Sequence, residues 1–272
     1  MVASYIKRKR RAAEKARAEK KGLLRTPDGS SRTARLRSRP ARLLDPRTID
    51  NKIFQTSWWA DDLRYYTTIG NTLWIKNPKC ASTSVAHGLG ILPRNKSYIT
   101  DPHRLDEIDF SSLTNALMVV RNPYDRLLSC YRDRIKQRGM KGYKSYRNKS
   151  FGDFVDIVCE KTDEYADQHF RSQHTFLAGL PPHVNIYIFY TESLNREWGN
   201  FVDLLDLSPL GEKEQKRIKS RISPRLGQHK RSRNSRNRKK PSDRQVYQNN
   251  PELVKKVKQR YNRDLELFEY SF

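Results

Sequence analysis

Three short apolar runs mark the part of the chain that follows residue 70. They are "NTLWIKN" (71–77), "NALMVVRN" (115–122) and "NIYIFYTE" (185–192). Each run is rich in β-branched and aromatic residues, as expected for strands that are buried on both faces of a parallel sheet. Helical periodicity follows the runs. The repeated order of strand and then helix therefore predicts an α/β fold, with a central, mostly parallel sheet and flanking helices.

Asparagine followed by proline marks two of the predicted helix starts. Asn122 ends the second run and Pro123 follows it, and Asn250 and Pro251 lie near the end of the chain. Asparagine is a good N-cap, and proline suits the first helical position. After Pro251 we expect one long helix, because apolar residues recur there every three or four positions: Leu253, Val257, Tyr261, Leu265 and Phe268.

Much of the positive charge lies outside the predicted core. The 272 residues include 55 Lys and Arg against 30 Asp and Glu, and the net charge of +25 implies an anionic partner. Residues 1–48 hold 16 basic and four acidic residues with few large apolar side chains, which predicts a disordered basic arm. The domain is then expected over residues 49–272, with a basic mobile loop at about 225–244.

The sequence predicts neither a membrane span nor a disulfide framework. No stretch approaches the roughly 20 apolar residues that cross a bilayer, and the N-terminus lacks the apolar centre of a signal peptide. Cys80, Cys130 and Cys159 lie far apart and form no CxxC pair, which also argues against a zinc site. These features favour a cytoplasmic protein with reduced thiols.

The segment "NPKCASTSV" (77–85) places reactive groups directly after the first predicted strand. A loop that leads from a strand into a helix presents unpaired N–H groups and the positive end of the helix dipole, and such sites bind phosphate. Lys79 adds a mobile ammonium group, and small residues add hydroxyl donors and an accessible backbone: Ala81, Ser82, Thr83 and Ser84. An ordinary serine-rich helix start is the alternative interpretation.

This loop differs from the P-loop of ATPases and GTPases. It lacks both glycines of G-x-x-x-x-G-K-[ST], and Lys79 precedes the hydroxyl residues instead of adjoining them. The next predicted strand runs into Arg121, where a nucleotide triphosphatase would carry a magnesium-binding acid. A cation at this strand end favours a second anionic group over a metal.

With both segments considered, the chain resembles the carbohydrate sulfotransferases, in particular the Golgi enzymes that sulfate chondroitin, dermatan, the HNK-1 epitope and the 2-O position of heparan. The resemblance spans roughly residues 70–272 and lies in these segments: "PKCASTS" (78–84), "VVRNPYDRLLSCYRD" (119–133), "DQHFRSQHTF" (167–176), "FYTESL" (189–194) and "YNRDLELFEYSF" (261–272). It implies a P-loop-like α/β domain that transfers a sulfuryl group from 3′-phosphoadenosine 5′-phosphosulfate (PAPS) to a carbohydrate hydroxyl without a metal. The Golgi relatives have an N-terminal anchor, so an incomplete N-terminus would instead imply the Golgi lumen.

The resemblance also implies roles for individual residues. Lys79 would stabilise the leaving oxygen, since catalysis of such a transfer depends on positioning and on charge stabilisation. Arg121 and Ser129 would hold the 3′-phosphate, and Arg225 of the basic loop would touch the nucleotide. The 5′-phosphosulfate would be bound by Lys79 together with Cys80, Ala81, Ser82, Thr83 and Ser84.

An acceptor hydroxyl also needs a base, and histidine suits this role near neutral pH. The resemblance to the 2-O-sulfating enzymes implies His103. His169 and His174 compete with it and could line the acceptor groove, and a purely structural role remains open for each of the three. Nearby acids could orient the imidazole or replace it: Asp101, Asp106 and Glu107.

Two other functions fit part of the sequence. The net charge of +25 and the basic arm also suit a polyanion- or nucleic-acid-binding protein, although no nucleic-acid-binding module is recognisable. A P-loop-like kinase that uses the same loop is the second alternative. For the enzyme we expect a saccharide acceptor, anionic glycans included, no specific nucleic acid, and an arm that contacts an acidic polymer or a membrane surface.

We also expect a lowered pKa for the Cys80 thiol, close to a helix start and Lys79.

Overall fold

The fold is built around one five-stranded sheet. The computed structural model describes residues 39–49, 66–90, 107–133, 146, 148–221 and 245–272. The strands of these residues are β1 (Arg42–Leu44), β2 (Tyr66–Ile69), β3 (Thr72–Ile75), β4 (Asn115–Val120) and β5 (Asn185–Tyr190), in the order β1-β5-β4-β3-β2. β3, β4 and β5 are parallel, whereas the outer strands β1 and β2 run antiparallel to their neighbours. The predicted α/β class and all three predicted parallel strands are confirmed.

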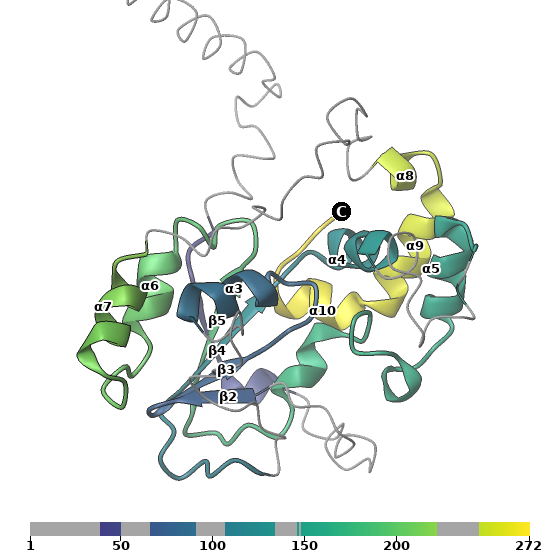
Figure 1. Cartoon of the computed structure of the whole chain (residues 1–272). Coiled ribbons are helices and arrows are strands. Elements are labelled where there is room, and N and C mark those ends of the chain that lie inside the picture. Colours follow the sequence, from purple (N-terminus) through teal and green to yellow (C-terminus); the bar gives the residue numbers. More distant parts are fainter. Residues whose placement is uncertain (1–38, 50–65, 91–106, 134–145, 147, 222–244) are drawn as a thin grey trace, which may run out of the picture. The chain divides into compact units, whose positions relative to one another are not determined.

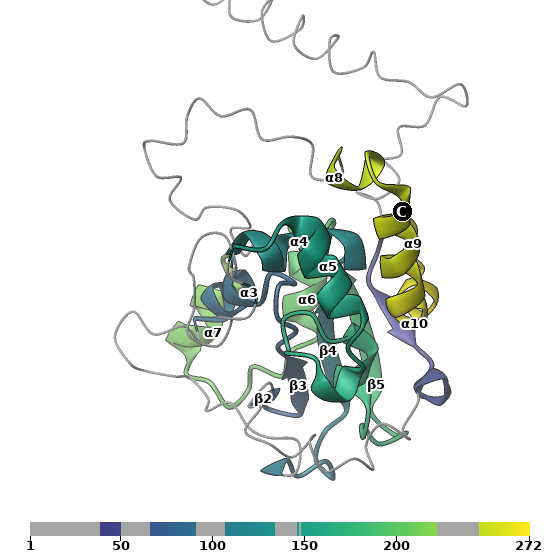
Figure 2. The same ribbon diagram turned by 90° about the vertical axis from the view of Figure 1, so that its right-hand side faces the viewer.

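Helices cover both faces of the sheet (Figure 1). One face packs against α3 (Ser82–Leu89), α6 (Trp198–Asp203) and α7 (Glu212–Lys219). The other face packs against α4 (Pro123–Cys130), α5 (Phe151–Cys159), α8 (Gln245–Gln248), α9 (Pro251–Arg260) and α10 (Asn262–Leu267). In the turned view, α4 and α5 lie in front of the strands (Figure 2). Short 3-10 turns are η1 (Pro46–Thr48), η7 (Asp163–Tyr165) and η8 (Gln173–Leu177).

Burial on both sides explains why the strand sequences lack polar alternation. Along the central strand β4, Leu117 and Val119 face the α3 side, and Met118 and Val120 face the α4 side. All four side chains are buried. Such a strand is held in place by apolar packing on two faces and by hydrogen bonds to two neighbours.

Both predicted asparagine caps are confirmed. The side chain of Asn122 accepts a hydrogen bond from the N–H of Tyr124, and the side chain of Asn250 accepts one from the N–H of Leu253. The single long C-terminal helix is wrong, however. Its backbone leaves the helical conformation at Tyr261 (φ −114°, ψ 24°), which separates α9 from α10.

The predicted boundary between arm and domain, at residue 48, is too late. β1 pairs with β5, so the residues before position 48 already contribute to the sheet. Antiparallel pairing uses backbone groups, and Leu44 is the buried side chain of this short strand. Arg42 adds a hydrogen bond of 3.2 Å to the carbonyl of Leu267 and an ion pair of 2.7 Å with Glu269. The rest of the predicted arm, residues 1–38, and the predicted basic loop lie outside the described residues.

Candidate active site

The carboxyl ends of two neighbouring parallel strands bring the predicted anion-binding residues to one edge of the sheet. β3 and β4 are paired in parallel, with Ile75 opposite Met118. The segment that holds Lys79 follows β3, and Arg121 follows β4 directly. Because parallel strands end at the same edge, the two cationic residues start from adjacent positions, as the sequence predicted.

The β3 loop, which we define as residues 76–81, has an unusual backbone. Lys79 (φ 68°) and Ala81 (φ 59°) both lie in the left-handed region, which is uncommon for residues other than glycine. Such conformations cost free energy and persist only where surrounding contacts enforce them. Here the side chain of Asn77 donates to the carbonyl of Val119 on β4 at 3.0 Å, and the N–H of Cys80 donates to the carbonyl of Asn77 at 3.3 Å.

The β3 loop leads into α3, and the first N–H groups of α3 are available to a ligand. Ala81 is the N-cap and offers no side-chain hydrogen bond, and the first helical bond is donated by Val85. Within the part of the chain that the structure describes, the N–H groups of Ser82, Thr83 and Ser84 donate to no protein acceptor. Unsatisfied donors at the positive end of a helix dipole suit a phosphate or sulfate group, so these residues fit the 5′ end of the implied nucleotide.

Lys79 is positioned by an ion pair. Its Nζ lies 2.8 Å from Oδ2 of Asp133, which follows α4 in the sequence. The two side chains are 14% and 25% exposed, so the pair lies near the surface without being fully solvated. Ser129 on α4 is half-buried and precedes Asp133 by four residues.

Cys80 does not behave as the sequence suggested. Its side chain is fully buried, and its Sγ lies 3.0 Å from Oε1 of Gln173. Burial raises the pKa of the thiol to about 12, so the expected lowering is wrong. The positive charge of Arg126 and Arg121 acts in the opposite direction but does not offset the loss of hydration. The thiol therefore remains neutral, and Cys80 is a buried support of the loop whose N–H already donates to the carbonyl of Asn77.

The backbone of Arg121 is fixed by hydrogen bonds, whereas its guanidinium group is available to a ligand. Its N–H donates to Oε1 of Gln173 at 3.0 Å, and its carbonyl accepts from Nε2 of Gln173 at 2.8 Å. Among the described residues its guanidinium group makes no hydrogen bond. An anchored backbone and an available guanidinium group suit the binding of an anionic group.

Arg126 of α4 supports the β3 loop through a hydrogen bond to its backbone. This buried residue of α4 donates from Nε to the carbonyl of Pro78 at 3.0 Å and from Nη2 to the carbonyl of Gln168 at 3.0 Å. Its Nη1 donates to the carbonyl of Arg171 at 2.5 Å. Sequence reasoning missed this residue. The available signal was a charged side chain next to Leu127 and Leu128, on the face of α4 that packs inward.

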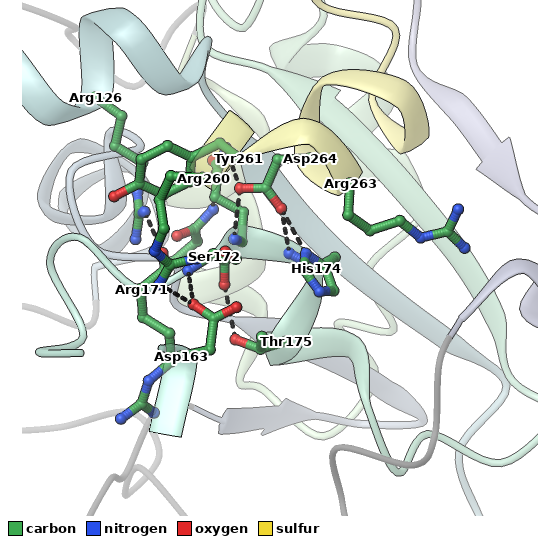
Figure 3. Close-up of polar contacts among 12 residues, drawn as sticks. Arg126, Asp163, Arg171, Ser172, His174, Thr175, Arg260, Tyr261, Arg263 and Asp264 are labelled. Atoms are coloured by element: carbon green, nitrogen blue, oxygen red, sulfur yellow. Dashed lines mark hydrogen bonds and ion pairs between the residues drawn. The ribbon is translucent and has the colours of Figure 1, made fainter. Parts of the chain in front are cut away.

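The histidines of the 167–176 segment are held by carboxylates. His169 Nδ1 lies 2.7 Å from Asp167. His174 Nδ1 lies 2.8 Å from Asp264 on α10 (Figure 3). Burial alone would lower the pKa of His174, but the hydrogen bond and the charge of Asp264 outweigh this and raise it. Both imidazoles thus have structural partners. His103 and Arg225, the other predicted site residues, lie outside the described residues.

A third strand end contributes a carboxyl group. Glu192 follows β5, and burial raises the pKa of its side chain above the ordinary value. The hydroxyl of Tyr270 donates to it at 3.0 Å, and the side chain of Asn122 donates to the carbonyl of Ser271 at 2.8 Å. The last residues of the chain therefore brace the same edge of the sheet that carries the β3 loop and Arg121.

Comparison with known families identifies the family of the chain. A family model described as the sulfotransferase family matches residues 71–271, from the start of β3 to the end of the C-terminal segment. The chain belongs to the sulfotransferase family. No curated protein and no solved structure matches the chain. The matched residues include the β3 loop, Arg121 and Ser129.

Within the ranges given above, no three His, Cys, Asp or Glu side chains gather as a metal site. None of the helices in those ranges is long and apolar enough to span a bilayer.

Proposed function

We propose that this sulfotransferase takes the sulfuryl group from PAPS and transfers it to a hydroxyl group of a carbohydrate acceptor. The observation that carries the proposal is the parallel pairing of β3 and β4, which starts the Lys79 loop and Arg121 from one edge of the sheet. PAPS has anionic groups on both its 5′ and its 3′ side. Two cationic strand ends next to each other suit such a donor better than they suit a ligand with one anionic group.

In this proposal the two strand ends divide the donor between them. The N–H groups at the start of α3, the hydroxyls of Ser82 to Ser84 and the ammonium group of Lys79 bind the 5′-phosphosulfate. The guanidinium group of Arg121 and the hydroxyl of Ser129 bind the 3′-phosphate. Arg225 is proposed as a further contact from the basic segment.

The proposed reaction is an in-line displacement at sulfur. The acceptor oxygen forms a bond to sulfur while the bond from sulfur to the bridging oxygen of the 5′-phosphate breaks. Negative charge collects on that bridging oxygen, and Lys79 stabilises it. The proton of the acceptor hydroxyl passes to a base, for which we propose His103. His169 and His174 are the weaker candidates, because the carboxylates that hold them already account for their positions.

The acceptor is proposed to be a saccharide, anionic glycans included. The net charge of +25 supports an acidic polymer near the enzyme, and the basic arm is proposed to concentrate the protein on such a polymer or on an anionic membrane surface. Incubation with ³⁵S-labelled PAPS and a panel of glycans would identify the acceptor. A His103→Ala variant should lose most turnover at neutral pH, whereas a His183→Ala control should retain it. Full turnover by the His103 variant would move the role of base elsewhere.

Isothermal titration calorimetry separates the proposed donor from its alternatives. Adenosine 3′,5′-bisphosphate should bind tightly without magnesium. A preference for magnesium ATP would instead indicate a kinase. Salt-dependent binding to random DNA without any response to the bisphosphate would indicate a polyanion-binding protein.

A further inference from the structure

The two proposed halves of the donor site are joined by the side chain of one buried residue, Gln173. It opens η8 and is 0% exposed. It is 93 residues from Cys80 and 52 residues from Arg121 in the sequence, yet it contacts both.

The carboxamide of Gln173 pairs with Arg121 as a neighbouring strand would. Oε1 accepts from the Arg121 N–H at 3.0 Å, and Nε2 donates to the Arg121 carbonyl at 2.8 Å. Arg121 lies just beyond the last residue of β4, Val120. The side chain therefore extends the ordered backbone of this strand by one residue and fixes the point from which the Arg121 guanidinium group projects.

The same oxygen also holds the β3 loop. Oε1 of Gln173 lies 3.0 Å from Nδ2 of Asn77 and 3.0 Å from Sγ of Cys80. Asn77 begins the turn that carries Lys79 into its left-handed conformation. One acceptor atom thus contacts residues at both strand ends.

Gln173 is itself held firmly. Asp264 on α10 is fully buried and accepts from the Gln173 N–H at 2.7 Å, from the His174 N–H at 2.9 Å and from His174 Nδ1 at 2.8 Å (Figure 3). The backbone from which the Gln173 carboxamide projects is therefore fixed by its hydrogen bonds to Asp264. Buried networks whose members are satisfied in this way rigidify their surroundings.

We propose that Gln173 is a positioning residue that sets the spacing between the β3 loop and Arg121, so that one nucleotide engages both. The inference rests on the proposed function, because it assumes a donor with anionic groups at both ends. The residue has to be an amide. Glutamate would turn a negative charge toward the Arg121 carbonyl and Asp264, and asparagine is one methylene too short.

The test compares a ligand that needs both strand ends with ligands that need one. Adenosine 3′,5′-bisphosphate engages the β3 loop and Arg121 together, whereas adenosine 5′-monophosphate and adenosine 3′-monophosphate each engage one of them. Gln173→Met removes the polar contacts at similar volume. It should weaken bisphosphate binding about tenfold, the equivalent of one misplaced charge-assisted hydrogen bond, and leave both monophosphates within about twofold. Gln215→Met on α7, which removes a hydrogen bond of 2.8 Å to the Leu210 carbonyl, is the matched control.

A second variant covers the case in which Gln173→Met does not fold. Gln173→Glu keeps the size, and its protonated form keeps one donor and one acceptor. The charged and titratable groups near this position are Arg121 and Asp264, which contact the carboxamide, His174, which Asp264 also holds, and Arg126 and Glu192, whose charges act on the adjacent Cys80 thiol. Since a buried carboxyl group gains protons as pH falls, the preference for the bisphosphate should be closer to that of the parent protein at about pH 6 than at about pH 8. The parent protein, measured at both pH values, corrects for titration of the phosphate groups.

The outcomes separate the two proposals. Equal weakening of all three ligands by Gln173→Met, or a pH-independent preference in Gln173→Glu, would overturn the positioning role while leaving the donor assignment intact. A parent protein that binds the bisphosphate no better than the monophosphates would overturn the donor assignment itself.

Discussion

Lys79 and Asp133 form an ion pair of 2.8 Å between residues that are 54 positions apart in the sequence. The pair connects the β3 loop to the segment after α4. It places a carboxylate beside the ammonium group that we propose to act on the leaving oxygen. An anion bound at the β3 loop must therefore share Lys79 with Asp133 or take it over.

Asp133→Asn is expected to strengthen nucleotide binding. The substitution removes a negative charge beside the proposed 5′ site while keeping the shape of the side chain, so the affinity for adenosine 3′,5′-bisphosphate should rise about three- to tenfold at low ionic strength. Calorimetric titration measures this directly. Asp156→Asn, which breaks a comparable pair of 2.6 Å with Lys256, is the control. Weaker binding would mean that Asp133 orients Lys79 for the ligand.

Lys79→Ala should reduce turnover far more than binding. The ammonium group is proposed to stabilise charge that develops only as the bond to sulfur breaks, so kcat should fall about 10²- to 10³-fold. The affinity for the bisphosphate should change less than about tenfold. Lys256→Ala serves as the control, and a steady-state assay with labelled donor gives both constants. An unchanged kcat would exclude this role.

Arg121→Ala should discriminate between nucleotides. Loss of a charge-assisted hydrogen bond costs about 1.5–3 kcal/mol, so bisphosphate binding should weaken about 10- to 100-fold. Adenosine 5′-monophosphate, which lacks the 3′ group, should bind nearly as well as before. Arg196→Ala, at a partly exposed pair with Glu197, is a suitable control. A similar loss for both nucleotides would argue against the 3′ assignment.

Arg126→Met is expected to destabilise the fold. Removing the guanidinium group leaves the carbonyls of Pro78, Gln168 and Arg171 without this buried donor, at a cost of about 3 kcal/mol in the free energy of unfolding. Urea denaturation with Arg47→Met as a solvent-exposed control measures the effect. A loss well below 1 kcal/mol would show that water or other groups replace these contacts.

His174→Gln should change how stability depends on pH. The folded-state pKa of His174 is raised above the ordinary value of about 6.5, so the protonated ring favours the folded state. The stabilisation is complete below the unfolded-state pKa and is lost as pH rises through the raised folded-state value. The stability difference between the parent protein and the variant should therefore shrink as pH increases across this window. Urea unfolding over a pH series tests this, with His183→Gln as the control. A constant difference would contradict the assignment.

The strands and helix starts were predictable because their signals are local. The apolar runs of β3, β4 and β5 reflect burial on both faces, and the caps Asn122 and Asn250 act within three residues of their own position. The common edge of Lys79 and Arg121 followed from the order of strands and helices. These features require no knowledge of distant contacts.

The remaining features depend on partners far away in the sequence. β1 is three residues long and joins the sheet through backbone pairing, so its sequence gives little sign of it. Gln173 and Arg126 act through backbone groups of other segments, and backbone groups have no sequence signature. For Cys80, proximity to a helix start predicted a lowered pKa, but complete burial raises the pKa instead. That burial depends on the folded structure and has no local sequence signal.

The proposed donor site is held together by four segments that lie far apart along the chain: the turn after β3, the segment from Arg121 through α4, η8 and α10. The proposed site is complete only in folded molecules, in which all four segments are in contact. A donor analogue should therefore bind the folded state alone and stabilise it against unfolding. The melting temperature should consequently rise with ligand concentration. This shift would allow candidate donors and inhibitors to be ranked before any acceptor is known.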